Sequence, residues 1–329
     1  MTKKITIIGG SGFVGTNLCR RLHDTGQSFE IVDLKKSRQF PELTKLADVR
    51  DLDSLRNAIS GQVVINLAAV HRDDVRDIDE YRLTNVVGAE NIIRVCAEKD
   101  IRKIIFTSTV AVYGFAEPGT NETGTVKPFN EYGRTKFAAE ERFRRWQKSG
   151  PHCLLIVRPT VIFGEGNRGN VYNLLRQIAS GKFIMVGDGK NKKSMAYVNN
   201  VVAFLEQCIA TDLSYGLFNY VDGPDMSMNE LVGLIRRSLL NKDGVGLRIP
   251  YVVGLAFGYT ADLMAKIIGR TLPVSAIRVK KFTAFTQFES SRTKLDGFQP
   301  PFTLAEGLIR TLENEFLKPD PDQEIFYTE

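Results

Sequence analysis

Two residues, Tyr132 and Lys136, have the types and the spacing of an acid–base pair. They stand four positions apart in a segment, 131–148, that is predicted to be helical, so their side chains share one helix face. Tyrosine, with an ordinary pKa of about 10, is a poor base at neutral pH, but a nearby ammonium favours the phenolate. The pair therefore suits the removal of a proton from an alcohol. An ordinary amphipathic helix carries the same spacing by chance.

A hydroxyl side chain is expected beside this pair, where it would hold the oxygen that reacts. Ser108 and Thr109 close a predicted strand, 103–109, and both are candidate catalytic residues. Together with the glycine-rich turn described next, they favour an active site over a chance match.

The segment 9–15, GGSGFVG, contains both GxxGxxG and GxGxxG. It follows a predicted strand and opens a predicted helix, which is the context that a dinucleotide-binding turn requires. Glycines let the backbone approach a pyrophosphate, and the helix start supplies unpaired N–H groups and the positive end of the helix dipole. The candidate cofactor contacts here are Gly9, Gly12, Phe13, Val14 and Gly15.

Asp33 ends the second predicted strand. A carboxylate there accepts hydrogen bonds from the adenosine ribose hydroxyls and repels a 2′-phosphate, which favours NAD over NADP. Lys35 and Lys36 leave NADP open, because a nearby cation can accommodate that phosphate. The residues expected beside the adenine are Asp48 and Val49.

The remaining sequence supplies the elements that position these residues. In the first half, apolar runs alternate with amphipathic segments, which predicts βαβ units and a doubly wound parallel α/β sheet of the Rossmann type. The predicted strands are 5–8, 29–33, 46–48, 63–69, 103–109 and 152–158. The predicted helices are one around 14–22 that stops at Gly26, one from Asp53 or Ser54 to about Gly61, 81–99 and 131–148.

After about Gly164, glycine-rich loops replace the regular alternation. Further helices are predicted at 171–180, 201–210, 228–240 and 304–316. We therefore predict an NAD-binding domain over 1–165, which also takes elements near 193–220, and a smaller α/β substrate domain over 166–329. The tail after Lys318, rich in proline and acids, is expected to be loose.

The composition limits the classes of partner that the protein is expected to bind. The net charge of +6 suits a diphosphate or an anionic membrane surface, whereas no basic run with interleaved aromatics predicts nucleic-acid binding. The four cysteines and three histidines do not cluster, so we expect core cysteines, a reducing compartment and no metal site. The start of the sequence lacks a signal-peptide pattern, and no uninterrupted apolar stretch reaches spanning length. We expect a cytoplasmic protein that can touch the inner membrane from its cytoplasmic face.

In combination the motifs resemble the extended short-chain dehydrogenase/reductase family, in its NAD-dependent epimerase and dehydratase group. The matching segments are GGSGFVG at 9–15, NLAA at 66–69, NVVGAEN at 85–91, TSTVAVYG at 107–114, YGRTK at 132–136 and RPTVIFG at 158–164. The resemblance implies that Tyr132 is the base, that Lys136 orients the nicotinamide ribose, and that Thr109 holds the reacting hydroxyl. It also implies a homodimer. The further cofactor contacts that it implies are Leu67, Ala68, Ala69, Asn85, Pro159 and Val161.

Departures from the family patterns narrow the set of reactions that the chain could catalyse. Sugar 4,6-dehydratases of the family have Asp-Glu directly after the catalytic Thr, where this chain has Val110 and Ala111. Water elimination therefore lacks its acid–base pair, and hydride transfer remains. Many nucleotide-sugar members have Asn in place of Val161 and Arg in place of Lys193. These differences weaken the case for an ordinary UDP-sugar substrate.

A closer resemblance covers the segments 71–75, 167–187, 193–200, 219–232 and 274–289. They are similar to the bacterial polyprenyl-diphosphate-linked N-acetylglucosamine 4-epimerases of O-antigen synthesis. This resemblance implies that the substrate is a lipid-linked sugar, N-acetylglucosaminyl-diphospho-undecaprenol, at the membrane surface.

Several residues are candidates for holding this substrate. His71 and Arg72 follow the fourth predicted strand, on the crevice side of a doubly wound sheet. Thr286 falls where a bulky tyrosine restricts some family members to non-acetylated sugars. The cations that could pair with the diphosphate are Arg168, Lys192, Lys193 and Arg292. Each of these can equally be a loop residue or a surface charge.

The segment 251–268 is mainly apolar and lies between Arg248 and Arg270. Such a segment can lie in a membrane interface while its cations meet anionic head groups. The pattern alone favours the alternative, a core helix of the substrate domain. The cations that could extend a basic membrane-facing patch are Arg278, Lys280 and Lys281.

We therefore predict a sugar 4-epimerase. Tyr132 takes the proton of the sugar 4-hydroxyl as hydride passes to NAD⁺, the 4-keto sugar turns over, and hydride returns to the opposite face. No net oxidation occurs, so NAD is tightly bound and recycled. Three alternatives stay open: a soluble UDP-sugar 4-epimerase, a 4-ketoreductase that consumes NADH or NADPH, and a cofactor-sensing binding protein. The intact set of Thr109, Tyr132 and Lys136 argues against the last.

Overall fold

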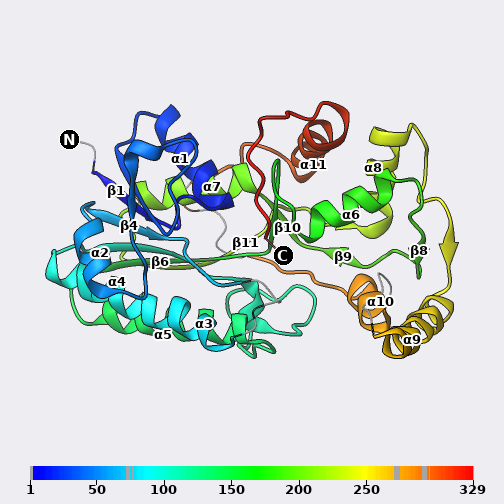
Figure 1. Cartoon of the computed structure of the whole chain (residues 1–329), viewed down its shortest axis with the longest axis horizontal. Helices are drawn as coiled ribbons and strands as arrows, with labels where there is room; N and C mark the ends of the chain where they lie inside the picture. The colour runs from blue at the N-terminus through cyan, green and yellow to red at the C-terminus, as the bar shows by residue number, and fades with distance from the viewer. Residues whose placement is uncertain are drawn as a thin grey trace.

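A seven-stranded, fully parallel sheet forms the centre of the protein (Figure 1). The structure is a computed structural model, and it describes residues 3–71, 75, 77–269, 275–290, 295 and 297–328. The strand order is β11-β6-β5-β4-β1-β2-β3, so the chain winds outward in both directions from β1 and β4. These strands are β1 (Ile5–Ile8), β2 (Phe29–Asp33), β3 (Thr44–Leu46), β4 (Val63–Asn66), β5 (Lys103–Thr107), β6 (Cys153–Pro159) and β11 (Tyr215–Tyr220). The predicted doubly wound α/β fold is confirmed.

Helices cover both faces of this sheet, because the central strands are apolar on both sides (Figure 1). Ile5 and Ile7 of β1 face one apolar cluster, which includes residues of α1 (Phe13–Asp24) and α7 (Val198–Ala210). Ile8 faces a second cluster. The helices of that second face are α2 (Leu52–Ala58), α4 (Gly88–Glu98) and α5 (Glu131–Lys148). This layering leaves the carboxyl ends of the strands free to carry the site.

The smaller part of the molecule lies beyond these carboxyl ends (Figure 1). Its helices are α6 (Asn170–Ala179), α8 (Met228–Leu240), α9 (Tyr251–Ile268), α10 (Ala276–Thr283) and α11 (Leu304–Leu312). Its short strands pair as β7 (Val161–Phe163) with β10 (Met195–Tyr197), β9 (Lys192–Lys193) with β12 (Met226–Ser227), and β8 (Met185–Val186) with β13 (Arg248–Ile249). Since α7 and β11 return to the large sheet, the chain segment near 193–220 serves both parts.

Several predicted boundaries are displaced. The third strand is Thr44–Leu46 rather than 46–48, because Thr44 to Leu46 pair in register with Ile31 to Asp33 of β2. The helix expected to begin at Asp53 or Ser54 is capped by Asp51, whose carboxylate accepts from the amides of those two residues. The short turns are η1 (Pro41–Leu43), η3 (Val110–Tyr113) and the π-helical η4 (Glu313–Leu317).

The long helix predicted over 81–99 is divided into three pieces. It begins earlier, as α3 (Asp79–Arg82), passes through one π-helical turn, η2 (Leu83–Val87), and continues as α4. A π-helical turn widens a helix locally and is common where a side chain serves a functional site. Asn85 lies in this turn.

The tail after Lys318 is not loose. The amide of Phe326 donates to the carbonyl of Gly166 at 2.8 Å, and the amide of Arg168 donates to the carbonyl of Phe326 at 2.8 Å. The prediction from composition was wrong because these partners are far away in sequence.

The prediction of a core helix over 251–268 is also wrong. Within α9 the buried residues are Gly254 and Gly258, and the large apolar side chains are exposed. A Cβ atom on Gly258 would lie 2.7 Å from the Ala276 backbone, which shows how closely α9 packs on α10. Within the described residues, α9 is long and apolar enough to cross a membrane by length and composition.

Candidate active site

The turn between β1 and α1 is shaped for close approach by a ligand. Gly9 has a φ of +81°, and a Cβ atom there would lie 2.7 Å from the amide nitrogen of Ala68. A Cβ atom on Gly15 would lie 2.4 Å from the carbonyl oxygen of Gly9. Because Gly12 precedes α1 and has no side chain to cap it, the first N–H groups of the helix are available to an anion.

Asp33 is fixed beside this turn by the backbone. Its carboxylate accepts hydrogen bonds from the amide of Ser11 at 2.9 Å and from the amide of Lys35 at 3.2 Å. Each oxygen is held by one of these donors, so lone pairs remain for the two hydroxyls of a ribose. This placement agrees with the preference for NAD that the sequence predicts.

Asn85 shapes the loop that carries Leu67, Ala68 and Ala69. Its side chain accepts from the amide of Val70 at 3.0 Å and donates to the Val70 carbonyl at 3.1 Å. The same amide group donates to Thr135 Oγ1 in α5 at 3.0 Å. Asn85 therefore ties the loop after β4 to the helix that carries the catalytic candidates, which is an indirect role in the cofactor site.

Tyr132 and Thr109 face each other as the sequence predicts. The Tyr132 side chain forms a hydrogen bond with the Thr109 side chain, while burial raises the pKa of Tyr132 to about 12 and this hydrogen bond lowers it. Thr109 is held in turn, because its hydroxyl oxygen accepts from the amide of Ala111 at 3.1 Å. An alcohol placed against both oxygens could give its proton to Tyr132 only when Tyr132 is a phenolate.

Lys136 is buried, with an exposed fraction of 1 %, and its ammonium lies 4.2 Å from the centre of the Phe106 ring. No described residue accepts a hydrogen bond from this ammonium. Burial lowers the pKa of Lys136 to about 7, against the nearby charge of Glu140, which raises it. In the protein alone, Lys136 therefore does not bring the pKa of Tyr132 down as expected. A buried donor of this kind fits the hydroxyls of a bound ribose.

Residues 5–219 match the family described as the NAD dependent epimerase/dehydratase family. The chain belongs to this family. Three features are consistent with NAD binding: the glycine turn, the fixed Asp33, and the buried Lys136 ammonium, which donates to no described residue. The family, together with the relatives described next, makes the chain an NAD-dependent carbohydrate epimerase.

Two relatives of this epimerase are themselves named as 4-epimerases. It is 45 % identical to the N-acetyl-alpha-D-glucosaminyl-diphospho-ditrans,octacis-undecaprenol 4-epimerase of Escherichia coli O157:H7 over the whole of both chains. It is 28 % identical to the UDP-glucose 4-epimerase of Vibrio cholerae over 95 % of each chain. The solved UDP-N-acetylglucosamine 4-epimerase of Bacillus cereus superposes with a TM-score of 0.74 at 19 % identity, covering 94 % of this chain and 97 % of that one. The last likeness shows the shared fold.

Ser108 does not join the catalytic group. Its hydroxyl donates to Glu140 Oε1 at 2.5 Å, and its side chain is buried. The adjacent hydroxyls have different partners, because Ser108 is bonded to Glu140 while Thr109 is bonded to Tyr132. We therefore assign Ser108 a structural role.

The other cofactor candidates lie where strands end. Asp48 accepts several hydrogen bonds from Arg50, at 2.6 to 3.0 Å, and this pairing lowers the pKa of Asp48. Val49 is buried against Gly88. Pro159 ends β6, and Val161 begins β7 with 40 % of its surface exposed. Their contacts with NAD stay predictions.

Among the substrate candidates, His71 lies close to the catalytic group. Its ring is 6.3 Å from the ring of Tyr132, in an edge-on arrangement. Arg72 and Arg292 lie outside the described residues. Thr286 is exposed and bridges to the strand at Lys193. The structure therefore places His71 beside Tyr132 and Thr286 beside strand β9.

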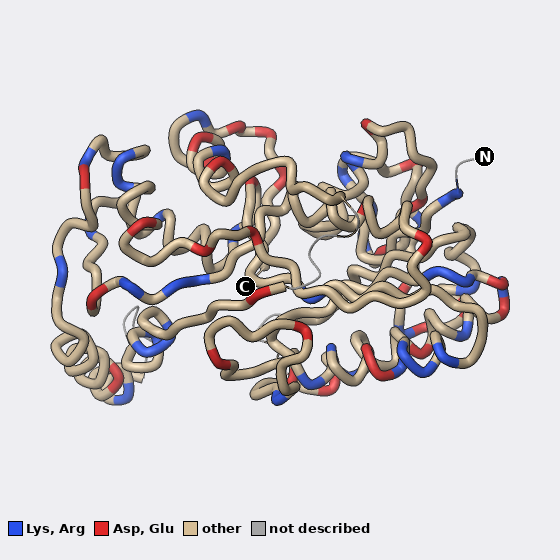
Figure 2. Tube along the Cα trace, turned by 180° about the vertical axis from the view of Figure 1, so that it is seen from behind, with Lys and Arg blue, Asp and Glu red and all other residues tan. Residues whose placement is uncertain are grey.

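Lys193 and Arg168 are not free to bind a diphosphate. The Lys193 ammonium donates to the carbonyls of Lys281 at 2.9 Å and Ala284 at 2.6 Å, and burial lowers its pKa to about 8. Arg168 forms an ion pair with Glu315 at 2.6 Å. Among the described diphosphate candidates, this leaves Lys192, which lies in the basic run along β9 (Figure 2).

A buried polar network next to the site went unpredicted. The guanidinium of Arg158 donates to both oxygens of Glu140 and to the hydroxyl of Tyr113, which donates to Asn219. One signal was available: Glu140 stands four residues after Lys136, so it continues the same helix face. Among the described residues, no group of three or more His, Cys, Asp or Glu is placed to hold a metal ion.

Proposed function

We propose that this epimerase interconverts N-acetylglucosaminyl- and N-acetylgalactosaminyl-diphospho-undecaprenol at the cytoplasmic face of the inner membrane. The similarity to the Escherichia coli relative over the full chain supports this substrate. The observation that carries the lipid-linked part is the exposed apolar surface of α9.

The chemistry follows from three side chains. When bound, NAD supplies a hydride acceptor and donor and a positive charge that favours the Tyr132 phenolate. Thr109 holds the sugar 4-hydroxyl, and Tyr132 takes its proton as the C4–H bond breaks. The 4-keto sugar then presents its other face, and Tyr132 returns the proton to the oxygen. Lys136 holds the ribose, so NAD stays bound and is recycled.

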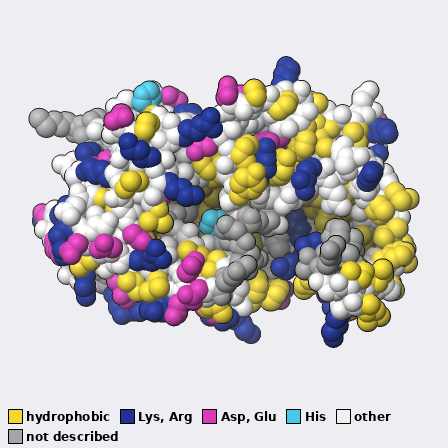
Figure 3. Space-filling view, in the orientation of Figure 1, with side chains coloured by type: hydrophobic (Ala, Val, Ile, Leu, Met, Phe, Trp, Pro, Cys, Tyr) yellow, Lys and Arg dark blue, Asp and Glu magenta, His cyan; other side chains and the backbone are white. Residues whose placement is uncertain are grey.

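The apolar side chains of α9 form an outward surface at one end of the molecule (Figure 3). We call this surface the α9 face; its most exposed members are Val252, Phe257, Leu263, Ile267 and, from α10, Ile277, each at least 58 % exposed. A contiguous apolar surface of this kind is unusual on a soluble monomer and marks an interaction site.

The α9 face carries the cations that an anionic membrane would attract. Lys280 of α10 lies against Tyr259 of α9, with its ammonium 3.1 Å from the phenol oxygen. Asp262, the acid of α9, is exposed, and its carboxylate accepts from the amide of Ala276 in α10 at 3.1 Å. The surface therefore presents apolar and basic groups while its acid is satisfied, as an interfacial helix does.

We infer that the substrate lies along the segment that follows α10. The segment after α10 bridges to Lys193 through Thr286 and to Thr120 through Phe288. A hollow of about 500 Å³ opens at the start of α9, lined by residues that include Val186, Gly187, Tyr251 and Thr283. A substrate along this path would have its lipid at α9, its diphosphate near Lys192 and its sugar at Tyr132.

The decisive experiment compares two substrates without added cofactor. Purified protein is incubated with undecaprenyl-diphosphate N-acetylglucosamine or with UDP-N-acetylglucosamine, and the sugars released by mild acid are resolved. N-acetylgalactosamine from the lipid substrate alone supports the proposal. Product from the UDP-sugar alone would make the protein a soluble UDP-sugar 4-epimerase. In a separate assay with added NADH, its stoichiometric consumption would make the protein a ketoreductase.

The proposal includes a homodimer, as in the resembled family. Light scattering of the purified protein tests it, with a mass near twice 36.8 kDa expected.

A further inference from the structure

The last described segment, 323–328, crosses the loop that follows β7. We call this segment the strap. It makes two backbone hydrogen bonds of 2.8 Å through Phe326, one with Gly166 and one with Arg168. Thr328 adds a hydrogen bond of 2.7 Å from its hydroxyl to Asn167. The strap is therefore held at two points, by an isolated β-bridge at Phe326 and by the Thr328 hydroxyl.

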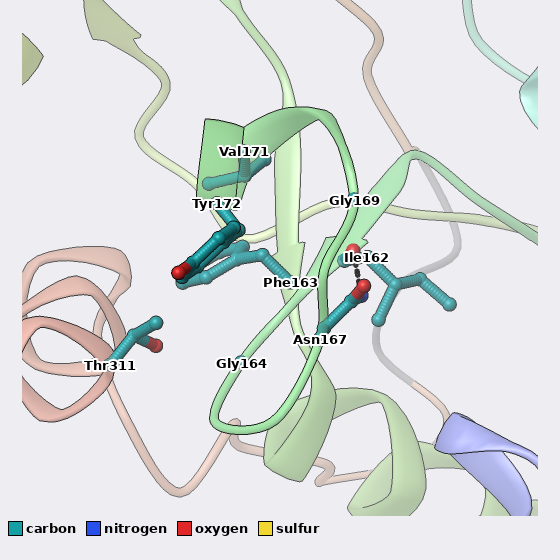
Figure 4. A pocket seen from close by; sticks show the side chains of 8 residues that line it. All are labelled: Ile162, Phe163, Gly164, Asn167, Gly169, Val171, Tyr172 and Thr311. Atoms are coloured by element: carbon teal, nitrogen blue, oxygen red, sulfur yellow. Dashed lines mark hydrogen bonds between the residues drawn. The ribbon is translucent and has the colours of Figure 1, made fainter. Parts of the chain in front are cut away.

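The loop beneath is built to accept the strap. A Cβ atom on Gly166 would lie 2.6 Å from the carbonyl oxygen of Glu324, and one on Gly169 would lie 2.6 Å from Thr328 Oγ1. The cavity beside this loop has a volume of about 10 Å³, room for one water molecule, and Asn167 points across it to the Ile162 carbonyl (Figure 4). The strap and loop therefore form a closed contact rather than a ligand pocket.

Phe326 extends this contact to the cofactor turn. Its ring lies 5.8 Å from the ring of Phe13, in a tilted arrangement. Phe13 is the first residue of α1, so its amide is one of the unpaired N–H groups that face a pyrophosphate. The Phe13 ring is 6 % exposed and also packs near Gly164. Phe326 thus packs against the ring of the first residue of α1.

We propose that Phe326 is a positioning residue of the NAD site and that the strap retains the bound cofactor. Aromatic pairs of this geometry contribute beyond simple burial, so the ring of Phe326 restricts the motion of Phe13 and of its amide. An epimerase that recycles NAD gains from slow cofactor release, because exchange is not needed between turnovers. The inference rests on NAD dependence and is independent of the lipid-linked substrate.

The test measures cofactor release from the purified holoenzyme. Protein loaded with labelled NAD is diluted into an excess of unlabelled NAD, and retained label is followed over time. We expect Phe326→Ala to release NAD at least about tenfold faster than the unchanged protein. Tyr327→Ala is the matched control, because the neighbouring Tyr327 side chain is 74 % exposed and should release NAD at the unchanged rate.

Two further measurements keep the outcome decisive. Phe326→Leu, which preserves apolar packing, should release NAD at an intermediate rate, and saturating NAD should restore the kcat of Phe326→Ala. The inference is overturned if Phe326→Ala and Tyr327→Ala release NAD at equal rates, or if Phe326→Ala lowers only the melting temperature. Since release is measured without any sugar substrate, failure of the proposed substrate would leave this result unaffected.

Discussion

Glu140 and Arg158 are joined inside the protein by two hydrogen bonds of 2.8 and 2.6 Å. Both side chains are buried, Glu140 at 0 % exposure and Arg158 at 1 %. The pair links α5, one turn beyond Lys136, to the sixth strand of the sheet. The pair therefore fixes the position of α5 along the sheet, relative to the end of β5, which Thr109 follows.

Glu140→Gln should destabilise the protein by about 3 to 5 kcal/mol, because it leaves the Arg158 guanidinium buried without a counter-charge. Unfolding in urea measures the change. Glu141→Gln is the matched control on the same helix, since the Glu141 side chain is 44 % exposed. Equal stability of the two variants would contradict a structural role for the buried pair.

Tyr132→Phe should reduce kcat by about a thousandfold, because it removes the hydroxyl that meets Thr109 and exchanges the proton. NAD content and melting temperature should stay close to those of the unchanged protein. Tyr172→Phe, on α6, should keep full activity. Substantial turnover by Tyr132→Phe would remove Tyr132 from the mechanism.

Lys136→Met should weaken NAD binding and lower activity while stabilising the cofactor-free protein by about 2 kcal/mol at neutral pH. Burial lowers the pKa of Lys136 to about 7, below its unfolded value, so the folded state binds fewer protons between these values. The stability of the cofactor-free protein should therefore rise with pH above 7, and Lys136→Met should lose that rise. Urea titrations at pH 6, 8 and 9.5 measure it, with the exposed Lys148→Met as control.

Glu30 supplies a stability contribution that acid removes. Burial acts to raise the pKa of Glu30, but hydrogen bonds from Lys4, Ser60, Thr6 and Lys45 outweigh it and bring the pKa to about 2. The contribution, on the order of 2–3 kcal/mol, is present above the unfolded pKa and lost as pH falls toward 2. Glu30→Gln should therefore be less stable than the unchanged protein at pH 7, with the gap closing toward pH 2. A gap that stays constant with pH, or a similar loss in the exposed Glu42→Gln, would contradict this account.

Leu263→Ser and Ile267→Ser should each weaken binding to anionic phospholipid vesicles by about tenfold, because each removes exposed apolar surface from α9. Co-sedimentation with vesicles measures binding. Turnover of a short-chain, water-soluble sugar diphosphate should stay unchanged. Leu317→Ser, at an exposed position outside α9 and α10, should bind vesicles normally. Unchanged vesicle binding by both α9 variants would exclude this helix as the membrane contact.

Features set by neighbouring residues could be predicted from the sequence. The glycine turn, Asp33 at a strand end, and the spacing of Tyr132 and Lys136 each have a local physical cause, and the structure brings them together at one sheet edge. The cap at Asp51 was misassigned by two or three positions, to Asp53 or Ser54, because several acids and a serine near α2 are equally suited to capping.

Features set by residues that are distant in the sequence could not be predicted from it. Lys193 is held by carbonyls about ninety positions later in the chain. Ser108, which follows β5, is held by Glu140 of α5. Phe326 and Phe13 come from opposite ends of the chain. The exposure of α9 depends on which elements lie against it, and an apolar sequence alone does not show this.

The place of α9 at one end of the long axis of the molecule governs how the protein would stand on a bilayer (Figure 1). With the α9 face in the head groups, the protein stands upright, and the seven-stranded sheet projects into the surrounding water. Its footprint is then that of the small domain alone. Many copies could then bind to one patch of membrane, with each cofactor domain surrounded by water.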